Sequence, residues 1–295
     1  MSQKCGFVSI IGKPNEGKST LMNAIIGAKL SIITAKPQTT RKRILGIYTE
    51  NDTQIIFTDT PGIIKPKYEL QKRMMDYVDE SIKESDLIIY LLSADVLVKK
   101  DIPDYMIDML REYKNKKIAV INKMDLLENK KDVLPFIAKM YTLNLFEDIV
   151  PISAINNDNV DRLIEVIASK MPQHDFVYEE DMLSTQHQRF FVSEIIRETV
   201  FEEFKEEVPY SSDVQITEFK ERDSGKWFIA ADIVIERTSQ KKIIIGENGS
   251  GIKKIGALSR VKIEEHLGTE VYLELFVKVR ENWRDNKSKL KYMGY

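Results

Sequence analysis

The sequence has very little that would suit an oxidising or membrane-embedded protein. Cys5 is the single cysteine among 295 residues, so no intramolecular disulfide can form, which fits the reducing cytoplasm. The longest apolar runs, such as Leu87–Leu92, have the length of a strand and fall short of the roughly 20 residues that a membrane-spanning helix needs. The first residues lead directly into an apolar segment, and we expect no signal peptide.

The sequence also lacks a large excess of charge of either sign, and it lacks histidines spaced as metal ligands. The formal net charge is −2, which argues against a surface coated in positive charge for bulk nucleic-acid binding but leaves room for a local basic face. The three histidines, His174, His187 and His266, are scattered without metal-ligand spacing. Hydrophobic residues at 43% and charged residues at 31% are ordinary for a globular protein, and the length suits two domains.

The first part of the chain alternates short apolar segments with helical patterns. The segments expected to be strands are Phe7–Ile11, Ile44–Thr49, Gln54–Asp59, Leu87–Ser93, Ile118–Asn122 and Ile149–Ser153. The expected helices are Lys18–Ile26, Ile102–Tyr113, Val133–Leu143 and Val160–Lys170. This alternation predicts an α/β domain with a mostly parallel sheet covered by helices on both faces.

The pattern changes after Met171-Pro172. We expect the α/β domain to cover 1–172, a polar linker 173–184 and an α+β domain 185–295. In the last part, Val192, Ile196, Val200 and Phe204 recur every four residues on one helix face. Strands are expected at Val214–Phe219, Trp227–Glu236 and Val271–Val279, with a helix that ends at His266 before the last of them.

A phosphate-binding motif follows the first expected strand and opens the first helix. It fits the pattern G-x-x-x-x-G-K-S/T and consists of Gly12, Lys13, Pro14, Asn15, Glu16, Gly17, Lys18 and Ser19. Its exposed backbone N–H groups and the helix N-terminus favour phosphate. Lys18 is expected to reach the β- and γ-phosphates, and the Ser19 hydroxyl to bind Mg²⁺.

Two further segments complete the predicted catalytic site. Asp59, Thr60, Pro61 and Gly62 end the third strand, where the carboxylate can hold Mg²⁺ and the Gly62 N–H can contact the γ-phosphate. The loop Lys36–Arg41 contains two threonines, and one of them is expected to join the Mg²⁺ shell only when the γ-phosphate is present. Thr40 is preferred over Thr39 because the second threonine resembles the Mg²⁺-binding position of related switch loops. Ile63 stands where many small GTPases carry a water-orienting glutamine, so hydrolysis is expected to be slow or to use another device.

Guanine selection is the most specific signal. Asn122, Lys123, Met124 and Asp125 lie at a strand end, where the Asp125 carboxylate can accept hydrogen bonds from N1–H and the 2-amino group of guanine. Adenine lacks that donor pair, and a buried, unpaired Asp125 would reject it. Ser153-Ala154 follows the next strand, and the Ala154 N–H is expected to donate to guanine O6.

A second glycine-rich loop lies in the C-terminal part. Gly246, Glu247, Asn248 and Gly249 form a G-x-x-G loop, the signature with which KH domains clamp about four nucleotides. Ile243, Ile244, Ile245, Ile252 and Ile255 are expected to line an apolar groove for bases. The basic residues expected to cluster around the loop are Lys241, Lys242, Lys253, Lys254 and Arg260, and residues 241–295 carry 12 Lys/Arg against 7 Asp/Glu. Trp283 and Tyr292–Tyr295 have two open interpretations: they stack on bases, or they pack a terminal helix onto its domain.

Together these motifs resemble the Era family of bacterial Ras-like GTPases over nearly the whole chain. Further markers are Pro37–Arg41, Gln188-Arg189-Phe190 and the ending Met293-Gly294-Tyr295. The resemblance implies GTP hydrolysis with Mg²⁺ through Lys18, Thr40, Gly62 and Asn15, with Asn15 holding a potassium ion. It also implies a KH type II domain that binds the 3′ end of 16S rRNA, a role in 30S subunit maturation linked to cell growth, peripheral association with the inner face of the membrane, and a monomer.

Two departures and two alternatives accompany this resemblance. Glu16 stands where the family usually has a small apolar residue, and Glu247-Asn248 is less basic than the usual pair. The alternative functions are a GTPase whose C-terminal domain binds protein or membrane, and an ATPase or other nucleotide enzyme. A steep salt dependence of RNA binding separates the first alternative, and the effect of Asp125→Asn on base preference separates the second.

Overall fold

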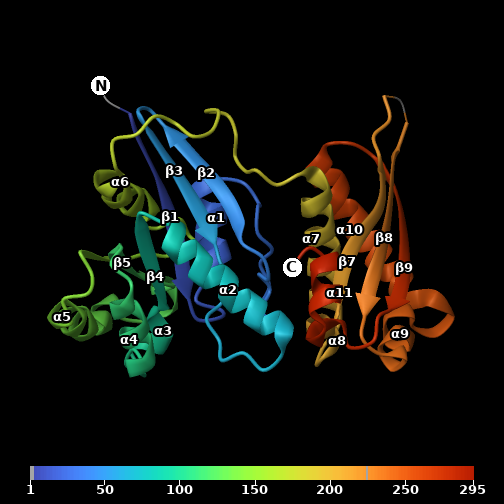
Figure 1. Ribbon diagram of the computed structural model, residues 1–295, viewed down its shortest axis with the longest axis horizontal. Helices are drawn as coiled ribbons and strands as arrows, with labels where there is room; N and C mark the ends of the chain where they lie inside the picture. Colours follow the sequence, from blue (N-terminus) through green and yellow to red (C-terminus); the bar gives the residue numbers. More distant parts are fainter. Residues whose placement is uncertain (1–2, 224) are drawn as a thin grey trace. The chain divides into compact units, whose positions relative to one another are not determined.

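The computed structural model describes residues 3–223 and 225–295, and these form two compact units (Figure 1). The first unit includes most of the chain up to Thr185, and the second includes Gln186–Tyr295. Two short segments from earlier in the chain, Ile32–Thr39 and Pro66–Arg73, also belong to the second unit. Each unit is described separately below.

The first unit contains a six-stranded sheet. The strands are β1 (Lys4–Gly12), β2 (Ile44–Glu50), β3 (Thr53–Asp59), β4 (Leu87–Ser93), β5 (Lys116–Asn122) and β6 (Asp148–Pro151). Their order is β2-β3-β1-β4-β5-β6, and only β2 and β3 pair antiparallel. The expected mostly parallel sheet is therefore confirmed. β4 is buried at every position, as a central strand covered on both faces should be.

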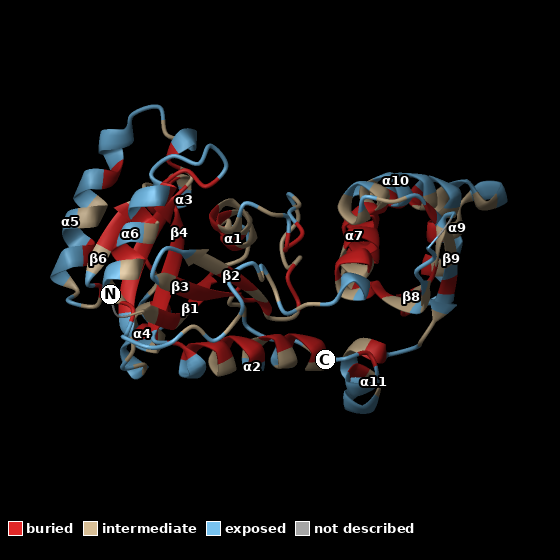
Figure 2. Ribbon diagram, turned by 90° about the horizontal axis from the view of Figure 1, so that it is seen from above, coloured by how far each residue is buried: buried red, intermediate tan, exposed pale blue. Residues whose placement is uncertain are grey.

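Helices cover both faces of this sheet (Figure 2). They are α1 (Lys18–Ile26), α2 (Glu69–Glu84), α3 (Ala94–Leu97), α4 (Asp104–Glu112), α5 (Leu134–Thr142) and α6 (Val160–Lys170). α3, α4, α5 and the end of α2 pack into one apolar cluster with β4 and β5. Gly27 ends α1 in the left-handed conformation, with φ at 70°, and its N–H bonds back to the Asn23 carbonyl.

α2 is a long helix that was not predicted from the sequence, and its first residues, Glu69–Arg73, belong to the second unit. Its composition is largely charged, yet Met74, Val78 and Ile82 recur every four residues and are buried. That spacing was a usable signal for an amphipathic helix. The strand predicted at Ile149–Ser153 is shorter at its end in the structure, where β6 covers Asp148–Pro151.

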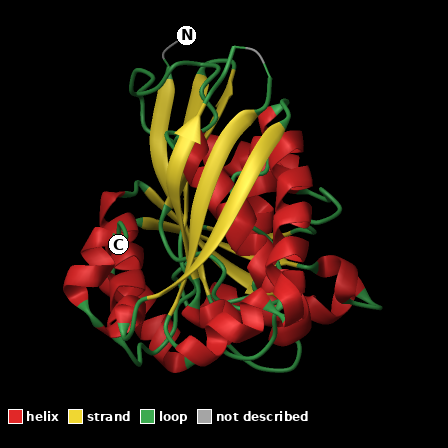
Figure 3. Cartoon of the chain, turned by 90° about the vertical axis from the view of Figure 1, so that its right-hand side faces the viewer, coloured by secondary structure: helices red, strands yellow, loops and turns green. Residues whose placement is uncertain are grey.

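The second unit is an α+β arrangement around a three-stranded sheet (Figure 3). The strands β7 (Asp213–Lys220), β8 (Trp227–Ile235) and β9 (Val271–Val279) lie in the order β7-β8-β9, with β8 and β9 parallel. The helices are α7 (Gln188–Glu203), α8 (Val208–Ser211), α9 (Thr238–Ile245), α10 (Ser250–Leu267) and α11 (Lys287–Tyr292). Side chains of α7, α9 and α10 form one core with the sheet, and the predicted helix face of Val192, Ile196 and Val200 lies in it.

The polar segment 173–184 is irregular but held against the first unit. Gln54, fully buried on β3, accepts hydrogen bonds from the backbone N–H groups of Val177 and Tyr178, each at 3.0 Å. The Ile47 N–H donates to the carbonyl of Leu183 at 2.9 Å. No helix in the described part of the chain has both the length and the apolar character to cross a lipid bilayer.

Candidate nucleotide site and candidate RNA groove

The phosphate-loop motif Gly12–Ser19 connects β1 to α1. The Lys18 amine lies over this loop and donates to the carbonyls of Gly12, at 3.3 Å, and Lys13, at 2.9 Å. Burial lowers the pKa of Lys18, and the negative charges of Asp59 and Glu16 oppose that shift. Gly17 has φ at 96°, and a Cβ there would meet Asn122 Nδ2 at 2.3 Å, so this position requires glycine.

Three candidate magnesium ligands meet at the head of this loop. The Ser19 hydroxyl donates to Asp59 Oδ2 at 2.7 Å and lies 3.0 Å from the Thr40 hydroxyl, which is 3.3 Å from the same carboxylate oxygen. Burial raises the pKa of Asp59, opposed first by Lys18 and then by the Ser19 hydrogen bond. A carboxylate and two hydroxyls are hard oxygen donors, so these residues fit Mg²⁺. Thr39 lies elsewhere: its carbonyl accepts from Arg197 Nη2 at 2.6 Å within the second unit.

The segment after β3 is fixed against the phosphate loop. The Thr60 hydroxyl donates to the carbonyl of Ile10 at 2.7 Å, and the Ile63 N–H donates to the carbonyl of Gly12 at 2.9 Å. A Cβ on Gly62 would lie 2.7 Å from the Pro14 backbone nitrogen. This approach holds the Gly62 backbone beside the loop that is expected to surround the phosphates.

Asn122 links the guanine motif to the phosphate loop. Its Nδ2 donates to the carbonyl of Glu16, and its Oδ1 accepts from the Ala154 N–H, both at 3.0 Å. Lys123 Nζ donates to the carbonyl of Asn15 at 2.6 Å, which places the lysine stem beside the loop. Met124 is buried and its N–H bonds to Ile152.

Two predicted base-site residues also make contacts within the site. The Ala154 N–H, expected to donate to guanine O6, donates to Asn122 Oδ1 at 3.0 Å. Asp125, expected to be buried, is exposed, and its Oδ1 accepts from the Ser153 hydroxyl at 2.5 Å. Ser153 thereby orients the carboxylate while the second oxygen remains available for further hydrogen bonds.

Glu16 turns its side chain into the core of the first unit. It is 5% exposed, and its Oε2 has no hydrogen-bond partner in the described part of the chain. Burial raises the pKa of this carboxyl to about 7, against the opposing effects of Lys18, a backbone hydrogen bond from Ser93, Lys123 and Lys13. The acidic side chain at position 16 therefore points into the protein and not into solvent.

We expect Glu16 to make stability fall as pH rises. The folded pKa of about 7 lies above the ordinary value of 4.5, so the carboxyl favours folding while neutral, and that contribution is lost as pH rises through 7. Relative to Glu16→Gln, the unfolding free energy of the protein should drop by about 2 kcal/mol between pH 5.5 and pH 8.5. Urea unfolding followed by circular dichroism measures this, and parallel pH profiles for the two proteins would contradict it.

The G-x-x-G loop joins α9 to α10. Gly246 and Gly249 have φ at 69° and 79°, and Glu247 and Asn248 between them are exposed. A Cβ on Gly246 would lie 2.8 Å from the Gly251 nitrogen, so the close turn requires glycine. The loop presents backbone to solvent, as a clamp on a nucleic-acid backbone needs.

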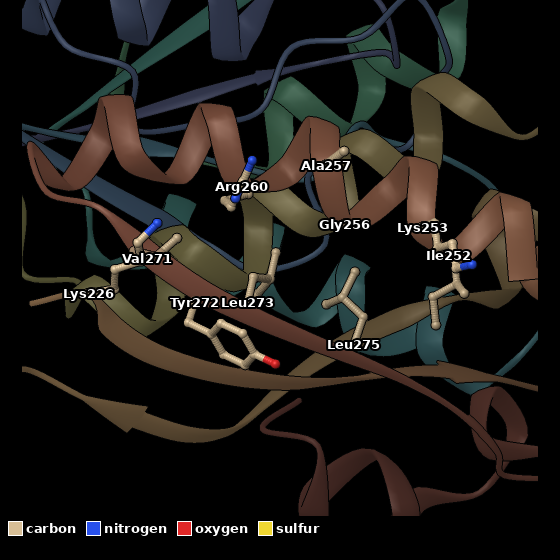
Figure 4. A pocket seen from close by; sticks show the side chains of 10 residues that line it. All are labelled: Lys226, Ile252, Lys253, Gly256, Ala257, Arg260, Val271, Tyr272, Leu273 and Leu275. Atoms are coloured by element: carbon tan, nitrogen blue, oxygen red, sulfur yellow. The ribbon is translucent and has the colours of Figure 1, made fainter.

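A groove of about 400 Å³ runs between α10 and β9, next to this loop (Figure 4). Apolar and basic side chains share its lining: Lys226, Ile252, Lys253, Gly256, Ala257, Arg260, Val271, Tyr272, Leu273 and Leu275. In Figure 4, Leu275 points from β9 toward Gly256 on α10.

The prediction of which isoleucines line the groove was largely wrong. Ile252 does, but Ile244 and Ile255 are fully buried in the core, Ile245 packs against that core, and Ile243 lies outside the groove. The contributions of Lys226 and of β9 to the lining were not predicted from the sequence. The alternation of Val271, Leu273 and Leu275 was the available signal for them.

The basic residues around the loop face different ways. Lys253 and Arg260 line the groove, whereas Lys254 pairs with Glu203 of α7 at 2.5 Å. Lys242 is exposed on α9 outside the groove lining. Only part of the predicted basic cluster is therefore directed at one surface.

Comparison with known proteins identifies both units. A family model described as "50S ribosome-binding GTPase" matches residues 7–123, and one described as "KH domain" matches residues 207–284. "GTPase Era" of Clostridium botulinum strain Hall is 43% identical over 294 residues, covering 99% of this chain and 98% of the relative. "GTPase Era" of Geobacter metallireducens is 46% identical over 293 residues with the same coverage.

Two solved structures are similar over 99% of both chains at 38% identity. One, with a TM-score of 0.94, is Era in complex with MgGDPNP and nucleotides 1506–1542 of 16S ribosomal RNA. The other, with a TM-score of 0.93, is a point variant of Aquifex aeolicus Era bound to GDP and AlF4⁻.

Proposed function

We propose the roles below from one premise: the chain belongs to the Era family of GTPases. It binds GTP, hydrolyses it to GDP and phosphate, and binds 16S ribosomal RNA near its 3′ end during maturation of the small ribosomal subunit. The observation that carries the enzymatic part is the meeting of Ser19, Thr40 and Asp59 oxygens in front of the Lys18 loop.

The phosphate loop and the segment after β3 hold the triphosphate. The backbone of Gly12–Ser19 surrounds the phosphates, Lys18 neutralises their charge, and the Gly62 N–H contacts the γ-phosphate, with Thr60, Pro61 and Ile63 holding that backbone in place. Ser19, Thr40 and Asp59 would hold Mg²⁺, which supplies positive charge to the β- and γ-phosphate oxygens. Crowding of Gly62 against Pro14 supports this arrangement.

The base is read at the ends of β5 and β6. Asp125 accepts hydrogen bonds from guanine, and the stem of Lys123 covers the ring face. Asn122 braces the loop between Glu16 and Ala154, and Met124 anchors it in the core. Ser153 orients the Asp125 carboxylate through their hydrogen bond.

Asn15 is proposed to hold a potassium ion beside the phosphates. Ile63 has no group with which to orient water, so hydrolysis needs a further device. Asn15 is exposed on the loop with φ at 65° and offers an amide oxygen. We expect faster GTP hydrolysis in KCl than in NaCl at equal ionic strength, with the difference lost in Asn15→Ala. Equal rates of the unaltered protein in the two salts would remove this role.

The second unit is proposed to bind single-stranded RNA. Gly246–Gly249 clamps the backbone, supported by Lys242, Ile245 and Lys254 around α9 and α10. Bases enter the groove beside Ile252 and Lys253, where Lys226 and Arg260 add positive charge. Because these contacts neutralise phosphates, affinity should fall steeply as salt rises, whereas a docked protein partner would show a shallower dependence.

Filling the groove should abolish RNA binding without harming the enzyme. A Cβ on Gly256 would lie 3.7 Å from Leu275 Cδ1, an ordinary contact, so Gly256→Leu extends a side chain into the groove from a helix that tolerates leucine. We expect at least about tenfold weaker binding of a labelled 16S 3′-end RNA, with unchanged GTP hydrolysis. Gly249→Asp should act in the same direction by placing a charge and strain at φ 79°.

Glu265→Leu is the matched control, because it adds the same side chain to an exposed position of α10 outside the groove. Undiminished RNA binding by Gly256→Leu would show that RNA takes another surface.

The cellular role is tested by crosslinking in cells followed by sequencing of the bound RNA. Recovery of the 16S 3′ end supports small-subunit maturation, whereas recovery from 23S or messenger RNA would overturn it.

We also propose domain bounds of 1–172, 173–184 and 185–295, a monomer, and a cytoplasmic protein that associates peripherally with the inner membrane face. These rest on family membership, and gel filtration and co-sedimentation with anionic vesicles test the last two.

A further inference from the structure

An acidic side chain is buried directly beneath the proposed phosphate loop. Glu16 lies at the centre of the Gly12–Ser19 segment, and Asn122 holds its backbone carbonyl at 3.0 Å. Its side chain enters a cavity of about 20 Å³ formed by the end of β4, α3 and the turn before α4. That volume has room for about one water molecule, so solvent can screen this carboxylate only weakly.

No charged side chain in the described ranges 3–223 and 225–295 forms an ion pair with Glu16. Lys13 lines the same cavity, but its amine lies over the Tyr105 ring, 5.8 Å from the centroid. Lys18 donates to two loop carbonyls, and Lys123 donates to the carbonyl of Asn15. The remaining charged or titratable groups near Glu16 are Lys100 and Asp101 at the cavity, the buried Tyr90 hydroxyl, and Asp59. Asp59 and Glu16 both interact electrostatically with Lys18.

We propose that Glu16 sets the nucleotide affinity of this protein by opposing the bound phosphates with a like charge. The proposal rests on the assignment of Gly12–Ser19 as the phosphate loop. Two effects act in the same direction. The carboxylate repels the phosphates through a medium of low dielectric. Its negative charge also offsets part of the positive charge of Lys18, which would otherwise attract the phosphates in full. A small apolar residue at this position would do neither, so GDP should leave this protein faster than it would with valine at position 16.

The test compares nucleotide affinity in Glu16→Gln and Glu16→Val with that of the unaltered full-length protein at pH 8.5, where the carboxyl is ionised. Both variants should bind GDP and GTP at least about tenfold more tightly and release a fluorescent GDP analogue correspondingly more slowly. The gain should be smallest for GMP, which has a single phosphate. Glutamine keeps the shape and polarity of the side chain, so it separates charge from packing.

Asp101→Asn is the matched control. Asp101 lines the same cavity, but its side chain is 57% exposed and pairs with Lys139 at 2.7 Å, so removing its charge should change affinity by less than about twofold. Unchanged GDP affinity in Glu16→Gln would overturn the proposal. An equal gain for GMP, GDP and GTP would also overturn it, because that result indicates packing. Failure of the unaltered protein to bind any guanine nucleotide would instead refute the phosphate-loop assignment.

Discussion

Asp125→Asn should lose GTP and gain xanthosine triphosphate. The carboxylate accepts hydrogen bonds from guanine N1–H and the 2-amino group, whereas asparagine presents an N–H donor that repels those donors and suits the 2-carbonyl of xanthine. Leaving such polar groups mismatched in a base site is expected to weaken GTP by about 100-fold or more. Competition between fluorescent guanine and xanthine nucleotides measures the switch, and hydrolysis of xanthosine triphosphate should persist because Lys18, Ser19 and Asp59 are untouched.

Two features of the structure sharpen this expectation. The Ser153 hydroxyl holds Asp125 Oδ1 at 2.5 Å and would hold an asparagine oxygen in the same way, so the variant should place its Nδ2 toward the base. Asp158 lies nearby, pairs with Lys130 at 3.0 Å and forms backbone bonds with Ser153. Asp158→Asn therefore serves as the control and should keep its preference for guanine. If Asp125→Asn retained that preference, the base would have to be read by another residue.

The nucleotide site was more predictable from sequence than the groove. Strand ends of a parallel sheet meet at one edge, so motifs that follow β1, β3 and β5 were expected to converge, and Ser19 and Asp59 do lie 2.7 Å apart. The orientation of Glu16 could not be derived, because the neighbouring glycine and asparagine do not fix which way the loop turns its side chain. It depends on the space between β4 and α3, which only the packed structure defines.

The groove depends on how a helix and an edge strand pair in three dimensions. A run of isoleucines after Lys242 looked like one apolar lining, but a helix distributes consecutive side chains around its axis, so Ile244 faces the core while Ile243 is exposed. The same geometry turns Lys253 into the groove and Lys254 toward Glu203. Local composition predicted the charge of this region but not its direction.

Trp283→Ala should destabilise the second unit by about 4 kcal/mol. Trp283 is fully buried, its Nε1 donates to the carbonyl of Ser211 at 3.0 Å, and its ring lies 6.3 Å from that of Tyr295. Leu290 and Met293, further along the C-terminal tail, are also buried, so the tail packs onto its own unit through these side chains. Of the two interpretations that the sequence left open for Trp283, the structure favours packing. The variant removes both a large apolar surface and the partner of a buried carbonyl.

Two further variants divide that loss and test the alternative. Trp283→Phe keeps most of the apolar surface but removes the indole N–H, and should cost about 1–2 kcal/mol in addition to a small packing loss. Tyr292, 75% exposed, is the control, and Tyr292→Ala should change stability by less than about 0.5 kcal/mol. Urea unfolding measures all three, with the fluorescence of Trp227 retained as the reporter. If Trp283→Ala kept its stability but lost RNA affinity, the tryptophan would have to act by stacking on a base, and its burial in the folded unit would need another explanation.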